Sequence, residues 1–334
     1  MKKNIKTITL NYDPNMLDHI LNNLKSAALI TDEDQTWLKN AERNKPFSVH
    51  WELKTLLYLG VVLLNVGLGY LIYQNIDTIG HVVIIALISL LCCGCFFYAA
   101  RTTLPFSLGE NKSPTPYFDY AVLLGCLTFL SVEGYLQFQY NVFGTRFGLA
   151  SFIPMLLFFP VAYYFDHRGA LSLAIIALGA WLGWTITPLD VLNQNHFSNH
   201  SLVYTGMALG IFLCLMGLLS EIKDVKKHFA FTYFNFGIHL FFMCALTALF
   251  NFNNNVLFIP LIILGVIFSV WYARKTGSFY TFLVAVIYGY IALTYLVINY
   301  LVSGESFNIL LLYFIITCGL LVGLLFNYKK VLNT

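Results

Sequence analysis

The chain has 334 residues, of which 58% are apolar and only 10% are charged, and its formal net charge is +3. A soluble globular protein carries about 25% charged residues, and a soluble fold of this length cannot bury so many apolar side chains. The composition therefore excludes a soluble protein and predicts one that is embedded in a membrane.

The amino-terminal segment, residues 1–53, precedes the first long apolar run, and residues 13–43 within it predict a cytosolic helical hairpin. Asp13 followed by Pro14 suits a helix start, because proline is tolerated at the first helical position. Thr31, with three acidic residues behind it, predicts the start of a second helix. Since this hairpin is too small for a core of its own, we expect it to dock on the inner loops or on a protein partner.

Ten apolar runs follow, each about 20 residues long, which is the length that a helix needs to cross roughly 30 Å of hydrocarbon. The runs are continuous, whereas the strands of a membrane barrel alternate apolar and polar residues. The sequence therefore predicts an all-α, polytopic membrane helix bundle with about ten transmembrane helices, surrounded by lipids and followed by a short cytosolic tail at residues 328–334. The expected spans are residues 54–74, 81–100, 118–138, 147–165, 170–188, 202–220, 230–250, 256–273, 279–301 and 309–327.

The distribution of Lys and Arg orients these spans, because short connections rich in these residues stay on the cytoplasmic side. With the amino terminus inside, 18 of the 19 Lys and Arg residues lie on that side and Arg146 alone lies outside. We therefore expect a multi-pass protein of the bacterial cytoplasmic (inner) membrane with both termini in the cytoplasm.

Residues 14–100 resemble a bacterial family of predicted polytopic membrane proteins of unknown function. Members of this family open with a cytosolic helical pair that contains a Gly-x-Ile-Thr-x-x-Gln turn, followed by a glycine-punctuated first span and an Asn-Trp type of loop. The matching residues here are Leu29, Ile30, Thr31, Gln35, Gly60, Gly67, Gly69, Asn75, Ile76 and Asp77. Ala28 stands where glycine is usual, and the loop lacks the Trp. The resemblance implies a membrane fold and no known activity.

No nucleotide-binding, dinucleotide-binding or hydrolase motif is present, and no basic tract suits nucleic acid. We therefore expect no cofactor, no nucleic-acid partner and no catalytic residue, and we do not expect an enzyme. The seven cysteines all fall inside expected spans, which indicates no disulfide framework.

Glu133 lies within the third expected span, where a carboxylate is costly and must face other helices or water. One interpretation is a group linked to the movement of protons or cations. The other is a solvated carboxylate near the outer boundary, paired with Arg146 in the next loop. The sequence leaves both open.

His239 lies deep in the seventh expected span, one helical turn after Asn235, so the two share a face. They line a polar pathway, or they hydrogen-bond across a helix interface. The same alternatives apply to Asn65 in the first span. The ninth span is rich in tyrosine, and those tyrosines near its middle either pack or line a pathway.

A weak metal motif lies between the fifth and sixth spans. His196 and His200 stand four residues apart, with Asp190 upstream as a possible third ligand. The glutamate of a zinc-protease motif is absent, so a solvated polar loop is the alternative.

Small residues at four-residue spacing allow helices to approach closely. Such pairs occur at Gly179 and Gly183 and at Gly206 and Gly210, inside the fifth and sixth spans.

Two functions fit these features. The first is a secondary transporter of a small solute, in which the ten spans form two five-helix halves of opposite orientation and the polar pathway contains Glu133 and His239. The second is a non-transporting membrane scaffold or sensor that recruits a partner through residues 13–43.

Overall fold

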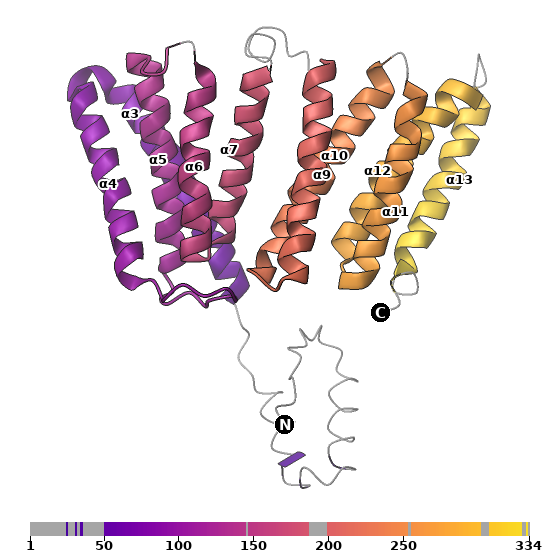
Figure 1. The fold of residues 1–334 in the computed structure, drawn as a ribbon, viewed down its shortest axis with the longest axis horizontal. Helices are drawn as coiled ribbons and strands as arrows, with labels where there is room; N and C mark the ends of the chain where they lie inside the picture. Colours follow the sequence, from indigo (N-terminus) through magenta and orange to yellow (C-terminus); the bar gives the residue numbers. More distant parts are fainter. Residues whose placement is uncertain are drawn as a thin grey trace. The chain divides into compact units, whose positions relative to one another are not determined.

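The chain forms two compact units, Met1–Leu57 and Tyr58–Thr334, in a computed structural model. The structure describes residues 25, 31, 34–35, 50–144, 146–186, 199–252, 255–301, 307–328 and 332. Within these ranges the chain forms ten long α-helices (Figure 1). Their bounds are α3 His50–Ile79, α4 His81–Thr102, α5 Phe118–Tyr140, α6 Phe147–Phe165, α7 Arg168–Ile186, α9 His200–Ile222, α10 Ala230–Asn251, α11 Phe258–Thr276, α12 Phe279–Leu296 and α13 Phe307–Phe326.

Eight helices of the described part are long and apolar enough to cross a membrane, and two shorter apolar stretches, Thr55–Tyr70 and Leu310–Phe326, lie within α3 and α13. No strand occurs in the described ranges. The predicted all-α, polytopic membrane helix bundle is therefore confirmed, whereas the orientation of the termini stays a prediction.

In the first unit, the described residues include the start of a helix at Asp34. The Thr31 hydroxyl and amide both donate to Asp34 Oδ2, at 2.7 and 3.0 Å, and the Asp34 amide donates to Thr31 Oγ1 at 3.2 Å. This reciprocal arrangement is a capping box, which satisfies amides that have no partner inside the helix. It agrees with the helix start expected at Thr31. The rest of the expected hairpin, residues 13–43, lies outside the described residues.

In the second unit, successive helices form four closely packed hairpins: α4–α5, α6–α7, α9–α10 and α11–α12. The two helices of each hairpin are joined at the same end of the unit (Figure 1). We call this the basic end, because its connections and the adjoining helix termini carry Arg101, Lys112, Arg168, Lys223, Lys226, Lys227, Arg274 and Lys275. Helices that are joined at the opposite end pack less extensively against each other.

The two five-helix halves differ in how their helices pair. In α3–α7 the second and third helices form a hairpin, as do the fourth and fifth, whereas in α9–α13 the hairpins are the first with the second and the third with the fourth. The two halves therefore do not repeat the same pattern of hairpins, as two inverted five-helix repeats would.

Helices α9 and α10 approach each other closely. A Cβ atom added at Gly210 would lie 2.7 Å from the amide nitrogen of Phe241 and 2.9 Å from the carbonyl oxygen of Gly237. One added at Gly206 would clash with Cys244 Sγ. The backbones of α9 and α10 meet because these positions lack side chains, as expected for small residues at a membrane helix interface.

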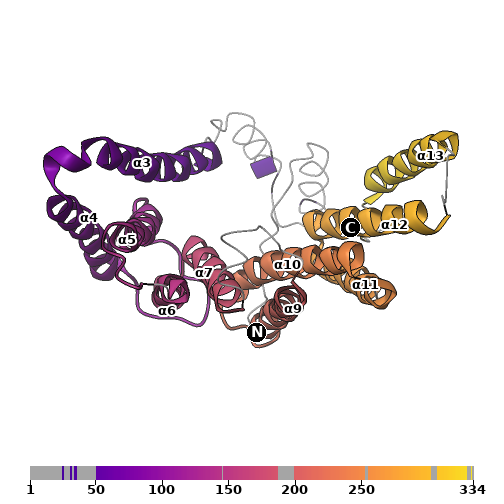
Figure 2. The same ribbon diagram turned by 90° about the horizontal axis from the view of Figure 1, so that it is seen from above.

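Two large apolar cores and a small third one, which contains Ala273, Phe282 and Leu332, occur in the described part of the second unit. The first joins α4–α7 to the basic-end halves of the α9–α10 hairpin, through residues such as Leu171 and Phe229. The second joins α9–α12 and includes Phe234, which stacks on Tyr272 with ring centroids 3.7 Å apart. The view from above (Figure 2) places α7 beside α9 and α10, where the two groups of helices meet.

Candidate functional site: a cavity between two hairpins

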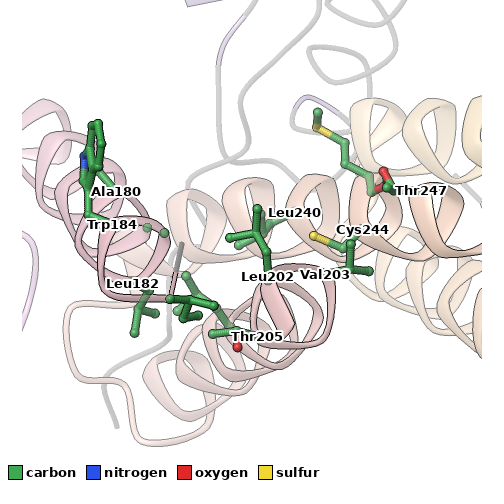
Figure 3. Close-up of a pocket in the computed structure, with 15 residues that line it drawn as sticks. Ala180, Leu182, Trp184, Leu202, Val203, Thr205, Leu240, Cys244 and Thr247 are labelled. Carbon is green, nitrogen blue, oxygen red and sulfur yellow. The ribbon is translucent and has the colours of Figure 1, made fainter. Parts of the chain in front are cut away.

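A cavity of about 470 Å³ lies between α7 and the α9–α10 hairpin. Figure 3 shows lining residues of α7, among them Ala180, Leu182 and Trp184, on one side of this space and lining residues of α9 and α10 on the other. Its volume lies within the roughly 300–1,000 Å³ range of small-molecule sites.

The walls of the cavity are almost entirely apolar. The residues that line it are Gly179, Ala180, Leu182, Gly183, Trp184, Ile186, Leu202, Val203, Thr205, Gly206, Leu209, Leu240, Met243, Cys244 and Thr247. A Cβ atom added at Gly179 would meet no atom within 4 Å, so this glycine opens space beside α7. The two glycine pairs noted in the sequence thus differ: the pair on α7 borders the cavity and meets no atom within 4 Å of an added Cβ, whereas the pair on α9 packs against α10, with Gly206 also at the edge of the cavity.

The cavity lies in the half of the hairpins that is remote from the basic end. Toward the basic end, the same hairpins are in direct contact: Tyr163 of α6 and Tyr233 of α10 share a hydrogen bond of 2.9 Å. Phe229 and Leu213 join the core that α6 and α7 form. The α6–α7 and α9–α10 hairpins are therefore packed together at the basic end and separated by the cavity beyond it.

A buried ionic cluster also connects these two hairpins at the basic end. We use this name for Asp166, in the α6–α7 turn, with Lys226 and His228, in the α9–α10 connection. Lys226 Nζ and His228 Nε2 lie 3.1 and 2.6 Å from Asp166 Oδ1, and the three side chains are only 1–5% exposed. Burying charges at such a depth is costly unless they are paired, so the contact depends on all three groups being together.

The connection between α4 and α5 covers the ionic cluster. The amide of Asn111 donates to Asp166 Oδ2 at 2.6 Å. The amide of Lys226 donates to the carbonyl of Leu108 at 2.7 Å. The Lys226 ammonium lies 5.1 Å from the centroid of the Phe106 ring, within reach of a cation–π contact. Three connections at the basic end thus meet at one point.

Both partners of the buried ion pair have left-handed backbone conformations, with φ of 58° at Asp166 and 49° at Lys226. Asp tolerates this region better than most residues, whereas Lys is uncommon there. The strained conformation at Lys226 persists because its amide, its carbonyl and its side chain are each held, the carbonyl by the Ser220 hydroxyl at 3.0 Å.

A second ion pair at this end has a different environment. Arg168 Nη2 lies 2.8 Å from Glu110 Oε1, but both side chains are more than half exposed. Water screens such a pair, and it contributes little to stability.

Glu133 is 7% exposed, and its Oε1 has no hydrogen-bond partner among the described residues. It follows Val122, Cys126 and Phe129 along one face of α5, and Phe129 packs edge-on against Phe158 of α6. Arg146 is exposed, and no ion pair between it and Glu133 occurs in the described ranges.

His239 and Asn235 belong to a hydrogen-bonded network between α10 and α12. Tyr280 donates its hydroxyl proton to Asn235 Oδ1 at 2.7 Å, so it accepts from His239 Nε2 at 2.8 Å. His239 Nδ1 is then the acceptor for the Tyr288 hydroxyl at 2.9 Å. Both ring nitrogens are satisfied, and two tyrosines of the ninth expected span are shown to bond His239.

Asn65 connects α3 to α5, since its Oδ1 accepts from the Ser131 hydroxyl at 3.3 Å. The four residues of the expected polar pathway are therefore distributed over two places. No hydrogen bond or ion pair joins Glu133 to His239 in the described part of the chain.

The expected metal ligands are only partly described. His200 begins α9, and its ring stacks on Phe252 with centroids 3.8 Å apart. Asp190 and His196 lie outside the described residues. No cluster of three potential metal ligands occurs in the ranges that the structure describes, and the metal site stays a prediction.

The sequence did not indicate the cavity or the ionic cluster. Asp166 is separated from Lys226 and His228 by about 60 residues, and of the three only Lys226 contributes to a sequence prediction, as one of the positive charges that orient the spans. One local signal was available: Asp166 directly follows a long apolar run, as expected of a residue at a helix end rather than in a solvated loop.

The helices, their length and their apolar composition define a polytopic α-helical membrane protein. Residues 22–171 match the model of a family described as "Predicted membrane protein (DUF2157)". The match confirms the resemblance found in the sequence, and the family description names no activity. No curated protein and no solved structure matches the chain.

Proposed function

We propose that the protein is a secondary transporter of a small solute, and that the cavity between α7 and the α9–α10 hairpin is its solute site. One observation carries the proposal: two separately packed hairpins touch at the basic end and border an open space of about 470 Å³ beyond it. Transport by alternating access requires two such bodies that rock about a site between them.

The solute is small and largely apolar. Thr205, Thr247, Cys244 and the indole of Trp184 are the polar groups among the lining residues, and none of the described residues that line the cavity is charged. A strongly charged solute would lose its hydration without gaining a partner. An uncharged or weakly amphiphilic organic molecule has much less hydration to lose, so it suits these walls.

The proposal places the protein in a bacterial inner membrane with the basic end and both termini in the cytoplasm, as the distribution of Lys and Arg predicts. The cavity then lies toward the outside, and the structure corresponds to the state that is closed on the cytoplasmic side.

Glu133 is the group that we propose to couple transport to protons. A carboxylate that is buried among membrane helices without a partner for Oε1 is far less costly when it carries a proton. His239 and Asn235, in contrast, have their hydrogen bonds satisfied by α12, which supports a structural role for them.

The test uses the Gly179→Leu protein, whose new side chain would extend into the cavity without a clash at Cβ. Gly94→Leu is the matched control, because Gly94 lies on α4, does not line the cavity and also has no atom within 4 Å of an added Cβ. A panel of small uncharged aromatic and aliphatic molecules is screened by thermal shift against the purified proteins, and hits are measured by counterflow in proteoliposomes.

We expect a hit to raise the melting temperature of the wild-type and Gly94→Leu proteins and not of Gly179→Leu. Counterflow should follow the same order. In Glu133→Gln, exchange should persist while accumulation driven by a pH gradient is lost. Hits that bind equally well to Gly179→Leu, or that bind without any flux, contradict the proposal.

A scaffold or sensor is the second candidate, and the capping box at Thr31 and Asp34 supports it, because it shows the start of an ordered helix within the segment expected to recruit a partner. Deletion of residues 1–45 separates the two functions. Counterflow that survives the deletion supports transport, whereas loss of a co-purifying protein on deletion, with no counterflow in either protein, supports recruitment.

A further inference from the structure

We propose that the ionic cluster of Asp166, Lys226 and His228 is the cytoplasmic gate of the cavity. This proposal rests on the proposed function, since it assigns to the cluster the control of access to the proposed solute site. The gate is closed in this structure, and it opens when the α6–α7 and α9–α10 turns separate.

The position of the cluster is the first argument. Asp166 belongs to the turn of one hairpin, and Lys226 and His228 belong to the connection of the other. These are the same hairpins that border the cavity in their remote halves. A contact between the two turns therefore determines whether the hairpins can part at the basic end.

The chemistry of the cluster is the second argument. An apolar contact would hold the turns together at a lower cost, because buried ion pairs are often no more stabilising than well-packed apolar groups. A buried ion pair is instead strongly dependent on geometry. Once water reaches Asp166 and Lys226, both ions regain hydration, so the separated state is not heavily penalised. The pair thus suits a contact with two alternative states.

The backbone is the third argument. Lys226 is held in a left-handed conformation by bonds to Leu108, Ser220 and Asp166. Separation of the turns would break the bond to Asp166 and release strain in this connection. The α4–α5 connection, which bonds to both sides of the cluster through Leu108 and Asn111, would lose its place at the same moment.

Cys244 provides a natural reporter, because it lines the cavity. A protein that retains Cys244 as its only cysteine is treated, in vesicles, with a membrane-impermeant maleimide from the side of the basic end. The gate is weakened by Asp166→Asn, since Asn also tolerates the left-handed backbone at this position. Lys226→Gln is the second gate variant.

We expect slow labelling of Cys244 from the basic side in the parent protein and labelling faster by about tenfold or more in either gate variant, because removing one partner destabilises the state that holds a buried pair. In the protein that carries both changes, Cys244 should be labelled no faster than in the more reactive of the two single variants, since both changes act through one contact. Arg168→Gln is the control, because it breaks the exposed pair with Glu110 at the same end and should leave the rate unchanged.

A parallel protein that retains only Cys126, which is fully buried, distinguishes opening from unfolding. If the gate variants label Cys126 as well as Cys244, the cluster holds the fold together and the gate is overturned. Unchanged labelling of Cys244 overturns it too. The two proposals can fail separately. If Cys244 is labelled faster in the gate variants but Gly179→Leu changes the binding of no hit, the gate is supported and the proposed solute site is not.

Discussion

Two buried carboxylates in the second unit have opposite surroundings. Asp166 Oδ2 accepts from an amide, and its Oδ1 lies within ion-pair distance of an ammonium and an imidazole. Glu133 is 7% exposed, and neither a hydrogen bond to its Oε1 nor an ion pair of its carboxylate occurs in the described part of the chain. The physical cost of burial is met by pairing at one residue and, in our proposal, by a proton at the other. The first suits a contact that holds elements together, and the second suits a group that exchanges an ion.

A third carboxylate, Asp34, allows a prediction about pH. Hydrogen bonds from the Thr31 side chain and amide hold the pKa of this carboxyl below its ordinary value. Because the pKa is lowered in the folded state, the helix start is stabilised above the pKa of the unfolded chain, and this stabilisation is lost as the pH falls through the lowered pKa. We expect Thr31→Ala to raise the pKa of Asp34 toward its ordinary value.

Carbon-13 NMR of the Asp34 carboxyl, in the full chain in detergent, measures this directly. Thr55→Ala is the matched control, since it removes a hydroxyl elsewhere and should leave the titration midpoint unchanged. An identical midpoint in the wild-type and Thr31→Ala proteins would mean that the capping box does not persist in solution.

At the scale of elements, the hairpins differ in what joins them. α9 and α10 meet through bare backbone at Gly210 and Gly237, whereas α10 and α12 are connected by the His239 network. The α6–α7 and α9–α10 hairpins combine an apolar contact with the ionic cluster. The first of these interfaces depends on close approach and has little freedom to move. The last depends on a polar contact and is the one that we expect to open.

We predict that Gly210→Ala destabilises the protein by about 1–3 kcal/mol, which is the usual cost of adding atoms to a closely packed interface. The new Cβ would lie within 3 Å of backbone atoms of α10, and backbone cannot move aside as a flexible side chain can. Unfolding in detergent, followed by circular dichroism, measures the change.

Gly94→Ala serves as the control for this experiment, because its added Cβ meets nothing within 4 Å. This variant should be as stable as the wild type or slightly more stable, since alanine is the better helix former. Equal stability of the Gly210→Ala and Gly94→Ala proteins would show that α9 and α10 do not approach as closely as the structure indicates.

At the scale of the whole molecule, the basic end and the cavity define opposite sides of the second unit. The connections within the four hairpins lie at one end (Figure 1) and carry the described Arg and Lys residues of the loops except Arg146, which lies between α5 and α6 at the other end. The cavity lies in the half of the hairpins away from the basic end. If the basic end is cytoplasmic, a solute reaches the cavity from outside in this state and leaves after the gate opens. The direction in which the gate faces therefore follows from the topology.

The topology can be tested with single cysteines in a cysteine-free protein. We expect Arg146→Cys to react with a membrane-impermeant maleimide only from outside the cell, and Lys227→Cys to react only in inside-out vesicles. Both side chains are exposed, so the reagent can reach them. The reverse pattern would show that the protein has the opposite orientation in the membrane and that the proposed gate lies on the external side.

The sequence by itself determined the all-α class, the approximate positions of the helices and the helix start at Thr31, because hydropathy, helix capping and charge are properties of residues that are close together in the chain. It also indicated that Asn235 and His239 share a face. Only the tertiary structure decided that Tyr280 and Tyr288 satisfy His239, that Gly179 faces a cavity while Gly210 packs against backbone, and that Asp166 meets Lys226. These contacts join residues from 27 to 60 positions apart. Which of these residues meet depends on how the helices pack against each other, and no local sequence pattern contains that information.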